Sequence, residues 1–243
     1  MLGQVRVVAG VDGRRGGWAL ALAAVDRRGR LARVDWHTVR GQTPEGVAEI
    51  LRLAAGAAAV GVDAPLGLPE DDWRPCDLQA KRRLGRGSAR VFLAPPRAVL
   101  AAPSYPDARE VARGMLGGRS ISAQTYGLRG VVLALDGALR ADPVLVRRVV
   151  EVHPELSFMA MAGRAPGDPL PHKRTPAGRA AREAALGRRL VPDLDVEDLE
   201  LPDGDDHLDA LAAAWSAARW AAGEAETLGG EPDAHGLPMR IVV

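Results

Sequence analysis

Two short apolar runs joined by a glycine-rich turn near the start of the chain constrain the fold most. Residues 5–11 form a β-branched run, and residues 18–25 form a second apolar run. The turn between them begins with Asp12-Gly13 and ends with Gly16-Gly17. Because apolar runs on both sides of a glycine-containing turn are typical of a β-hairpin, we expect two antiparallel strands here. The first of these strands ends at Asp12.

The segments that follow predict a sheet with both antiparallel and parallel strands. Residues 31–39 alternate apolar and polar side chains, as in a third, half-exposed strand. Thr43-Pro44 then marks a helix start, with Thr as N-cap and Pro at the first helical position. A fourth strand over residues 58–62 follows this helix. Since a strand reached through a helix is usually parallel to an earlier one, we expect it beside residues 5–11.

The remaining pattern predicts a single domain over residues 1–243 with a helical insertion. Residues 67–120 are irregular and rich in proline, which indicates an insertion or lid, and a fifth strand is expected over residues 147–153. Helices are expected over residues 76–84, 123–139, 177–190 and 205–228. This order predicts an α/β fold of the ribonuclease-H-like type. Its mixed five-stranded sheet has three antiparallel strands, then parallel strands, and is flanked by helices.

Composition and charge exclude several classes of protein. The formal net charge is only +1, so attraction to nucleic acid must come from local patches. No apolar stretch approaches the roughly 20 residues that span a bilayer, and the first residues lack the apolar run of a secretory signal. We therefore expect a cytoplasmic protein without a membrane role, with a homodimer as the candidate assembly. The single cysteine, Cys76, cannot form an internal disulfide and is expected to be an inert thiol.

Acidic residues fall at the ends of three predicted strands. Asp12 follows the first strand, Asp63 follows the fourth, and Glu151 lies near the end of the fifth. If the first and fourth strands are parallel neighbours, their ends lie about 5 Å apart, so Asp12 and Asp63 can reach one ion. The last predicted helix adds Asp206 and Asp209, which share a face because they are three residues apart. We expect these five carboxylates to be metal ligands.

Carboxylate oxygens suit Mg²⁺ or Mn²⁺, and two such ions about 4 Å apart can clamp a phosphodiester. One ion would activate water and the other would stabilise the leaving oxygen. His153 or Lys173 would assist proton transfer or hold the scissile phosphate. The sequence thus predicts a two-metal nuclease on an unidentified nucleic acid, with the five carboxylates, His153 and Lys173 as catalytic residues.

Three of these acids also have a structural explanation, whereas Asp209, beside the apolar Leu208 and Leu211, would be poorly placed without a partner. Asp12 begins an ordinary turn dipeptide, Asp63 precedes Ala-Pro at a strand end, and Asp206 is placed to cap a helix. Glu151 and Glu155 lie on either side of His153-Pro154, and we favour Glu151 as the one that joins the site. Two other functions stay open: an actin-like or sugar-kinase-like ATPase, and a non-catalytic binding protein that retains the fold. The ATPase requires a second glycine-rich phosphate loop, which the sequence does not show.

Two segments concentrate basic residues. Residues 74–97 contain seven basic residues against one acid, and residues 173–189 contain six against one. Both segments fit the footprint of a nucleic-acid backbone, and both also fit a solvated helix face. Aromatic stacking partners near the first segment are scarce, so we expect little sequence-specific recognition of single strands.

Several motifs taken together resemble one known family. They are Gly10-Val11-Asp12-Gly13, Gly61-Val62-Asp63-Ala64-Pro65-Leu66-Gly67-Leu68-Pro69, Arg74-Pro75-Cys76-Asp77, Glu151-Val152-His153-Pro154-Glu155, Lys173-Arg174-Thr175-Pro176 and Asp205-Asp206-His207-Leu208-Asp209-Ala210. Over nearly the whole chain the sequence resembles domain-of-unknown-function family 429, described as predicted ribonuclease-H-like nucleases. The last motif is also similar to the final helix of bacterial Holliday-junction resolvases. The resemblance implies metal-dependent phosphodiester cleavage and no particular substrate.

Overall fold

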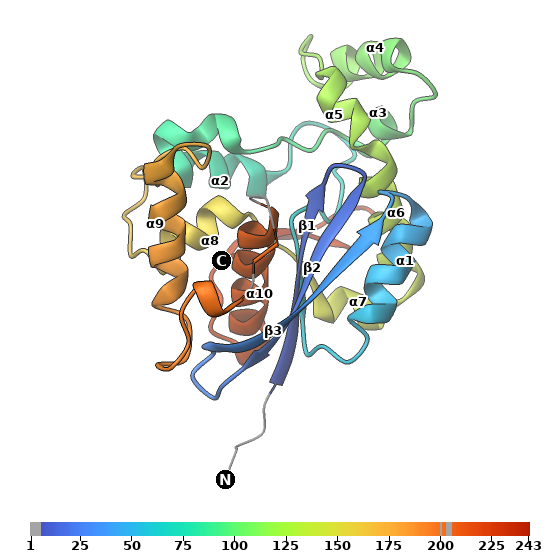
Figure 1. Cartoon of the computed structure of the whole chain (residues 1–243). Coiled ribbons are helices and arrows are strands. Elements are labelled where there is room, and N and C mark those ends of the chain that lie inside the picture. The colour runs from blue at the N-terminus through green and yellow to red at the C-terminus, as the bar shows by residue number, and fades with distance from the viewer. Residues whose placement is uncertain (1–5, 200, 203–205) are drawn as a thin grey trace.

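An antiparallel meander opens the fold. The computed structural model describes residues 6–199, 201–202 and 206–243, so the predicted starts at residues 5 and 205 lie outside the described residues (Figure 1). The meander consists of β1 (Arg6–Arg14), β2 (Gly17–Val25) and β3 (Leu31–Arg40). β1 pairs with β2 and β2 pairs with β3, both antiparallel. Gly16 has a positive φ of 80°, which a glycine adopts without steric cost in this tight turn.

Two short parallel strands complete the sheet. β4 (Val60–Val62) follows α1 (Pro44–Leu53) and pairs in parallel with β1, and β5 (Val149–Glu151) pairs in parallel with β4. The strand order is β3-β2-β1-β4-β5. This is the ribonuclease-H-like arrangement that the sequence predicted, with three antiparallel strands followed by parallel ones. β5 is shorter than predicted, because α7 (Pro143–Arg148) occupies the start of that segment.

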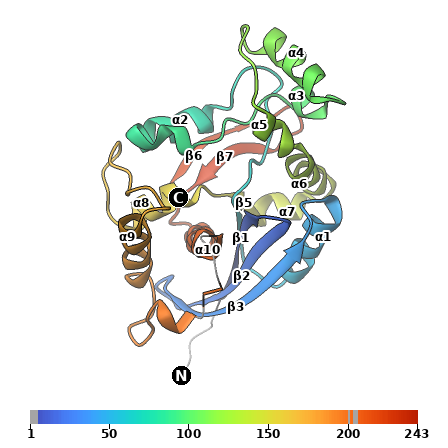
Figure 2. The same cartoon turned by 45° about the horizontal axis from the view of Figure 1, so that its top comes forward.

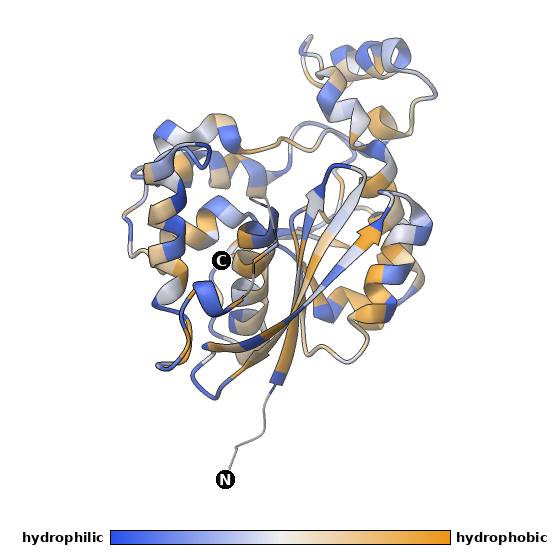
Figure 3. Cartoon of the chain, in the orientation of Figure 1, coloured by the Kyte–Doolittle hydropathy of each residue, from blue (hydrophilic) through white to orange (hydrophobic). Residues whose placement is uncertain are grey.

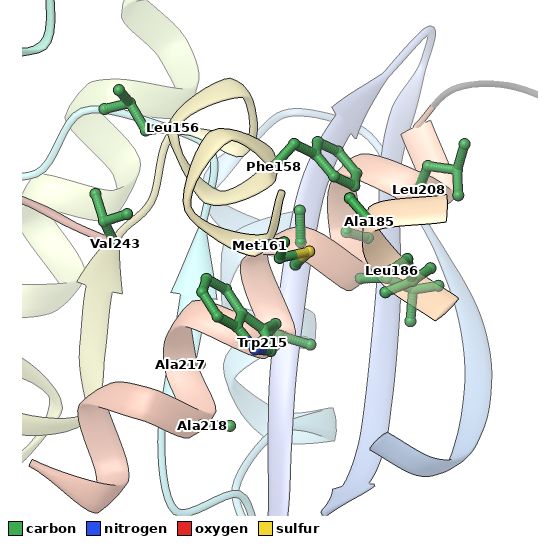
Figure 4. Packing of buried hydrophobic residues seen from close by; sticks show 14 of the residues in the cluster. Leu156, Phe158, Met161, Ala185, Leu186, Leu208, Trp215, Ala217, Ala218 and Val243 are labelled. Carbon is green, nitrogen blue, oxygen red and sulfur yellow. The ribbon is translucent and has the colours of Figure 1, made fainter. Parts of the chain in front are cut away.

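Helices cover both faces of the sheet. One face carries α10 (Asp206–Ala222) with α8 (Pro154–Met161) and α9 (Pro176–Gly187), and the other carries α1 and α6 (Arg129–Ala141). Figure 3 shows that hydrophobic residues concentrate along the strands. In Figure 4, Phe158 and Met161 of α8 and Leu186 of α9 gather around Trp215 of α10. No helix in the described part of the chain is long and apolar enough to cross a bilayer.

Two glycines let α10 lie directly on the backbone of the sheet. Gly10 on β1 and Gly61 on β4 are in register with each other. A Cβ atom added at Gly10 would lie 1.9 Å from the carbonyl oxygen of Ala210, and one added at Gly61 would lie 2.4 Å from that of Ala213. Real side chains never tolerate such contacts, so the height of α10 above the sheet depends on both glycines.

A series of helices joins β4 to α6. They are α2 (Pro75–Leu84), the 3₁₀ helix η1 (Gly85–Arg90), α3 (Arg97–Ala101), α4 (Tyr105–Met115) and α5 (Ala123–Gly127). The helices α3, α4 and α5 project beyond the sheet and enclose a small core of their own around Val99, Leu116 and Tyr126 (Figures 1 and 2). The single helix predicted over residues 123–139 is therefore two helices, α5 and α6, which meet at Leu128.

The end of the chain forms a second sheet that the sequence pattern did not predict. β6 (Thr227–Pro232) and β7 (Pro238–Val242) pair antiparallel. The prediction that the last helix reaches residue 228 was wrong, because α10 ends at Ala222 and Gly223 follows with a φ of 74°. The hairpin lies beside α2, where Gln79 Oε1 accepts a hydrogen bond from the Gly229 N–H at 3.0 Å (Figure 2). The 3₁₀ helix η2 (Glu197–Leu199) lies between α9 and α10.

Candidate functional site

Two aspartates lie side by side at the C-terminal ends of β1 and β4. The N–H of Asp63 donates to the Val11 carbonyl at 2.9 Å, which continues the parallel pairing up to Asp12. Because side chains alternate along a strand, Asp12 lies on the face of Gly10 and Asp63 on the face of Gly61. Both carboxylates therefore project toward α10, the helix that rests on these glycines.

Asp209 reaches the same edge from the first turn of α10. It directly precedes Ala210, the residue whose carbonyl lies over Gly10. Asp209 is only 4% exposed and Asp12 only 6% exposed, which is rare for acids. The close contact between the helix and the sheet thus brings three carboxylates from three separate segments together. We call Asp12, Asp63 and Asp209 the aspartate cluster.

The aspartate cluster holds more negative charge than its surroundings balance. Burial raises the pKa of Asp12 well above its usual value, and the charges of Asp63 and Asp209 raise it further. Burial also raises the pKa of Asp63, and it raises that of Asp209 to about 6 although Lys173 opposes the shift. The neighbouring Asp63 therefore favours the protonated form of Asp12. A proton or a cation must therefore compensate the cluster.

Lys173 supplies an ammonium group to the aspartate cluster. Its Nζ donates to Asp209 Oδ2 at 2.5 Å, and its side chain is partly exposed. Burial lowers the pKa of Lys173, but the negative charges of Asp209, Asp12 and Asp63 outweigh burial and raise it to about 12. One ammonium cannot balance three ionised carboxylates, so the cluster with Lys173 remains net negative when ionised.

Glu151 does not point at the aspartate cluster. It is in register with Val62, and paired residues of neighbouring strands project to the same face, so Glu151 lies opposite Asp63. There its two carboxylate oxygens each accept a hydrogen bond from Arg74 at 2.7 Å, and Oε2 also accepts one from the Leu66 N–H. The fully buried Arg74 also binds Asp77. Glu151 thus completes a buried ion cluster that ties the start of α2 to the sheet. It also lines the cavity to which Asp63 and Asp209 contribute, so its role as a metal ligand stays a prediction.

Of the two glutamates beside His153, Glu155 is the one whose charge acts on the aspartate cluster. Its charge raises the pKa of both Asp63 and Asp209, after the larger effect of burial. Glu155 is itself held by Arg90 at 2.8 Å and Arg182 at 2.5 Å. Both Glu151 and Glu155 line the same cavity, so the preference for Glu151 stays a prediction.

Asp206 does not join the aspartate cluster in the described part of the chain. Its charge acts instead on His207, whose pKa is lowered by burial and by Arg14 and raised by Asp206. Among the described residues, no group of three or more His, Cys, Asp or Glu side chains is arranged around a point where a metal would bind. Asp209 Oδ2 accepts the hydrogen bond from the Lys173 ammonium.

A cavity of about 280 Å³ opens over the aspartate cluster. Asp63, Asp209, His153 and Lys173 contribute to its wall, together with the apolar side chain of Phe92. The Nε2 atom of His153 lies 3.3 Å from the Arg90 carbonyl, and its Nδ1 atom is buried without a hydrogen-bond partner. The cavity thus places an imidazole and an ammonium beside the carboxylates.

The basic segments 74–97 and 173–189 are largely neutralised within the protein. Each of these ion pairs joins a basic residue of one segment to an acid: Arg74 with Asp77 and Glu151, Arg83 with Glu226, Arg86 with Asp168, Arg90 and Arg182 with Glu155, Arg97 with Asp136 and Asp233, Lys173 with Asp209, and Arg179 with Glu183. A carboxylate neutralises the guanidinium that it binds, so the ion pair attracts a phosphate only weakly. Residue counts along the sequence therefore overstate both segments as nucleic-acid footprints.

Sequence reasoning missed Arg74 and Arg182 as organising residues of this region. Both are fully buried, whereas the sequence placed them in exposed basic patches. The signal for Arg74 was its position three residues before Asp77 at a helix start, which favours an ion pair. Cys76 lies near Arg74 and is fully buried, and burial raises the pKa of its thiol, as expected of an inert cysteine.

Comparison with known proteins gives two similar folds and one family. A structure of Thermus thermophilus RuvC in complex with Holliday junction substrate has a TM-score of 0.44 and 18% identity, and a second Thermus thermophilus RuvC structure has a TM-score of 0.41 and 19% identity. Each comparison covers 90% of this chain and 97% of the RuvC chain. No curated protein matches the sequence. The family model described as "Protein of unknown function (DUF429)" matches residues 10–234, a span that includes the whole aspartate cluster, and the chain therefore belongs to this family.

Proposed function

We propose that this protein is a metal-dependent phosphodiesterase of the nuclease type. The observation that carries the proposal is the convergence of Asp12, Asp63 and Asp209, two of which, Asp63 and Asp209, line a cavity. Burying three carboxylates together costs stability, and a fold retains such an arrangement most readily where the charges have a use. Hard oxygen donors of this kind fit Mg²⁺ or Mn²⁺.

The aspartate cluster would hold the ion, and rigid elements fix its members. Asp12 and Asp63 lie at the ends of paired strands, and Asp209 lies on a helix in direct contact with them. When bound, the ion would supply an activated water and stabilise the leaving oxygen. Because the pKa of Asp12 is raised, a proton competes with the ion for this carboxylate and would have to leave before Asp12 could act as a ligand.

Lys173 and His153 would act on the substrate. An ion on Asp209 would weaken the hold of that carboxylate on the Lys173 ammonium, which is partly exposed and able to turn toward a phosphate. The buried, unpartnered Nδ1 of His153 makes the imidazole a candidate to accept or return a proton at the reacting oxygen. Phe92 in the cavity wall offers a ring on which a nucleobase would stack.

The site favours substrate binding through contacts within the cavity over electrostatic attraction to a broad basic surface. The basic segments expected to bind a backbone are mostly paired with acids, so contacts within the cavity would provide most of the affinity. An actin-like ATPase would need a second sheet of the same kind. The described residues form one five-stranded sheet and a two-stranded hairpin, which favours the phosphodiesterase.

The test combines Mn²⁺ binding with cleavage. Isothermal titration of the metal-free protein with Mn²⁺ and a panel of labelled single-stranded, duplex, branched and RNA-containing oligonucleotides would be applied to the wild type and to Asp12→Asn. Asp35→Asn, on the exposed edge strand β3, is the matched control. We expect Asp12→Asn to lose both binding and cleavage, and Asp35→Asn to keep both. Absence of Mn²⁺ binding at millimolar concentration would refute the metal site. Binding without cleavage of any substrate would favour the non-catalytic alternative.

A further inference from the structure

A second hollow lies at the opposite end of the sheet from the aspartate cluster. It measures about 470 Å³ and lies between the β2–β3 turn and the end of α10. Arg6, in its wall, is six residues before Asp12 on β1, so the two ends are about 20 Å apart along the strand. In Figure 1 this is the end of β1 nearest the N-terminus. Six arginines line the hollow: Arg6, Arg27, Arg28, Arg30, Arg189 and Arg219.

The charge of this arginine hollow is not balanced by the acids around it. Among the residues that the structure describes, Asp26 and Glu224 are the acids in its wall. Asp26 pairs with Arg30 at 3.1 Å and accepts hydrogen bonds from the backbone N–H groups of Arg28 and Arg30. Elsewhere in the protein, arginines such as Arg74 and Arg97 each bind two or more carboxylates. The arginine hollow therefore concentrates positive charge, whereas the charges of Arg74 and Arg97 are balanced by carboxylates.

Backbone carbonyls hold three of these guanidinium groups in place. Arg6 Nη1 donates to the Ala221 carbonyl at 2.9 Å, and Arg189 Nη2 donates to the Met161 carbonyl at 2.9 Å. Arg219 donates from Nη2 to the Glu224 carbonyl at 2.6 Å. A carbonyl orients a guanidinium but leaves its full charge, so the positive groups are fixed before any ligand arrives. Such preorganisation favours binding, because less side-chain entropy is lost.

Two of the arginines cover Trp215. The guanidinium carbons of Arg189 and Arg219 lie 5.5 and 5.0 Å from the centre of its indole ring, and Figure 4 shows the same ring packed against the core. The hollow thus offers N–H donors rather than an aromatic face. The Nε atom of Arg189 is buried without a hydrogen-bond partner. Burial lowers the pKa of Arg189, and the charges of Arg188 and Arg219 lower it further. A bound anion would offset this effect, because a nearby negative charge stabilises the charged guanidinium.

We propose that the arginine hollow binds a compact polyanion, namely the di- or triphosphate group of a small molecule. Guanidinium groups match phosphate oxygens in geometry and remain charged. Several fixed guanidiniums exceed what one phosphate needs, which favours two or three linked phosphates. With the Trp215 ring covered, the site would recognise phosphates and not a stacked base. This site is separate from the aspartate cluster and does not depend on the proposed phosphodiesterase activity.

Inorganic pyrophosphate is the probe for this site. Titration calorimetry would be run at low ionic strength with a chelator present, so that no metal site contributes. The test variant is Arg27→Gln/Arg28→Gln, because both side chains are exposed on the turn and their loss leaves the core intact. The matched control is Arg109→Gln/Arg113→Gln on the exposed side of α4. Arg189→Gln tests the buried donor, with its fold checked by circular dichroism.

We expect saturable binding of pyrophosphate that weakens about tenfold or more in Arg27→Gln/Arg28→Gln and in Arg189→Gln, and not in the control pair. Raising the salt concentration should weaken binding steeply. Absence of saturable binding, or equal weakening in the control pair, would overturn the proposal. So would a duplex DNA that binds more tightly than pyrophosphate through the same arginines, because the ligand would then be a nucleic-acid backbone.

Discussion

Gly10 on β1 and Gly61 on β4 lie in register, and the backbone of α10 rests on both. Asp12 and Asp63 follow these glycines by two residues, so each carboxylate projects to the same face. Asp209 lies at the end of α10 that reaches this edge of the sheet. Because Gly10 and Gly61 have no side chains, α10 lies close to the sheet. This close packing determines how near the three acidic side chains are to each other.

Replacing Gly10 with alanine should push α10 away from the sheet. The added methyl group would overlap the Ala210 carbonyl, and such overpacking costs about 1–3 kcal/mol or more in the free energy of unfolding. Urea denaturation measures this loss. Gly56→Ala is the control, since a Cβ there meets nothing within 4 Å and should change stability little. A similar stability for both variants would show that the helix adjusts freely.

Replacing Arg74 with methionine should leave Glu151 and Asp77 buried without their cation. Removing one partner from a buried ion cluster costs roughly 3–5 kcal/mol. The control is Arg86→Met, because Arg86 and Asp168 are largely exposed and such pairs contribute about 1 kcal/mol at most. Chemical denaturation of both variants gives the comparison. Equal effects would mean that the buried cluster contributes no more than a surface pair.

The stability of the protein should depend on the protonation of Glu151. Burial raises the pKa of Glu151 to about 7, although Arg74 lowers it, and the unfolded chain has the ordinary value near 4.5. The folded state therefore holds this proton more tightly, so its contribution is present below pH 4.5 and is lost as the pH rises through 7.

The stability of the wild type relative to Glu151→Gln should consequently fall by roughly 2–4 kcal/mol between pH 4.5 and pH 8. Denaturation of both proteins across this range measures the difference. A difference that is constant with pH, or that grows as the pH rises, would show that Arg74 keeps Glu151 ionised throughout.

Millimolar Mn²⁺ should raise the melting temperature of the metal-free wild type, because an ion that binds only the folded state stabilises it. Asp63→Asn should remove most of this shift, since it takes one carboxylate from the aspartate cluster. A chelator should return the wild type to its starting value. Equal shifts in Asp63→Asn and the wild type would place the ion elsewhere on the protein.

His153→Gln should separate proton transfer from metal binding. If the imidazole moves a proton, kcat should fall by about 10²–10⁴-fold while the affinity for Mn²⁺ stays near that of the wild type. Steady-state cleavage of the best oligonucleotide and titration with Mn²⁺ provide the two readings. A loss of Mn²⁺ affinity equal to the loss of activity would make His153 a metal ligand instead.

Local patterns were sufficient where local forces decide the structure. The first hairpin followed from two apolar runs around a glycine turn, and the helix after Thr43 followed from an N-cap and a proline. The hairpin of β6 and β7 could not be predicted in this way. Its short strands lack a clear alternation, and contacts with distant residues hold it, such as those of Asp233 with Leu68 and Arg97.

Charge patterns were less informative than apolar ones. Arg74 belonged to an apparent basic patch in the sequence, but its partner Glu151 lies 77 residues away. A charge run predicts an exposed surface only if the chain brings no acid to it. In this protein the fold brings acids to most of the two basic segments, and the arginine hollow gathers its charges from four separate parts of the chain.

The sequence by itself determined that an acid lies near the end of β1, that another follows β4 and that acids lie in the first turn of the last helix, because apolar runs, turns and helix periodicity are local properties; β1 itself continues past the predicted end at Asp12 to Arg14. Only the tertiary structure decided that Asp12, Asp63 and Asp209 meet, that Lys173 joins them and that Glu151 turns to the opposite face. The physical reason is register: the face on which a strand residue lies depends on how its strand pairs with its neighbour, and contacts between distant segments fix that pairing.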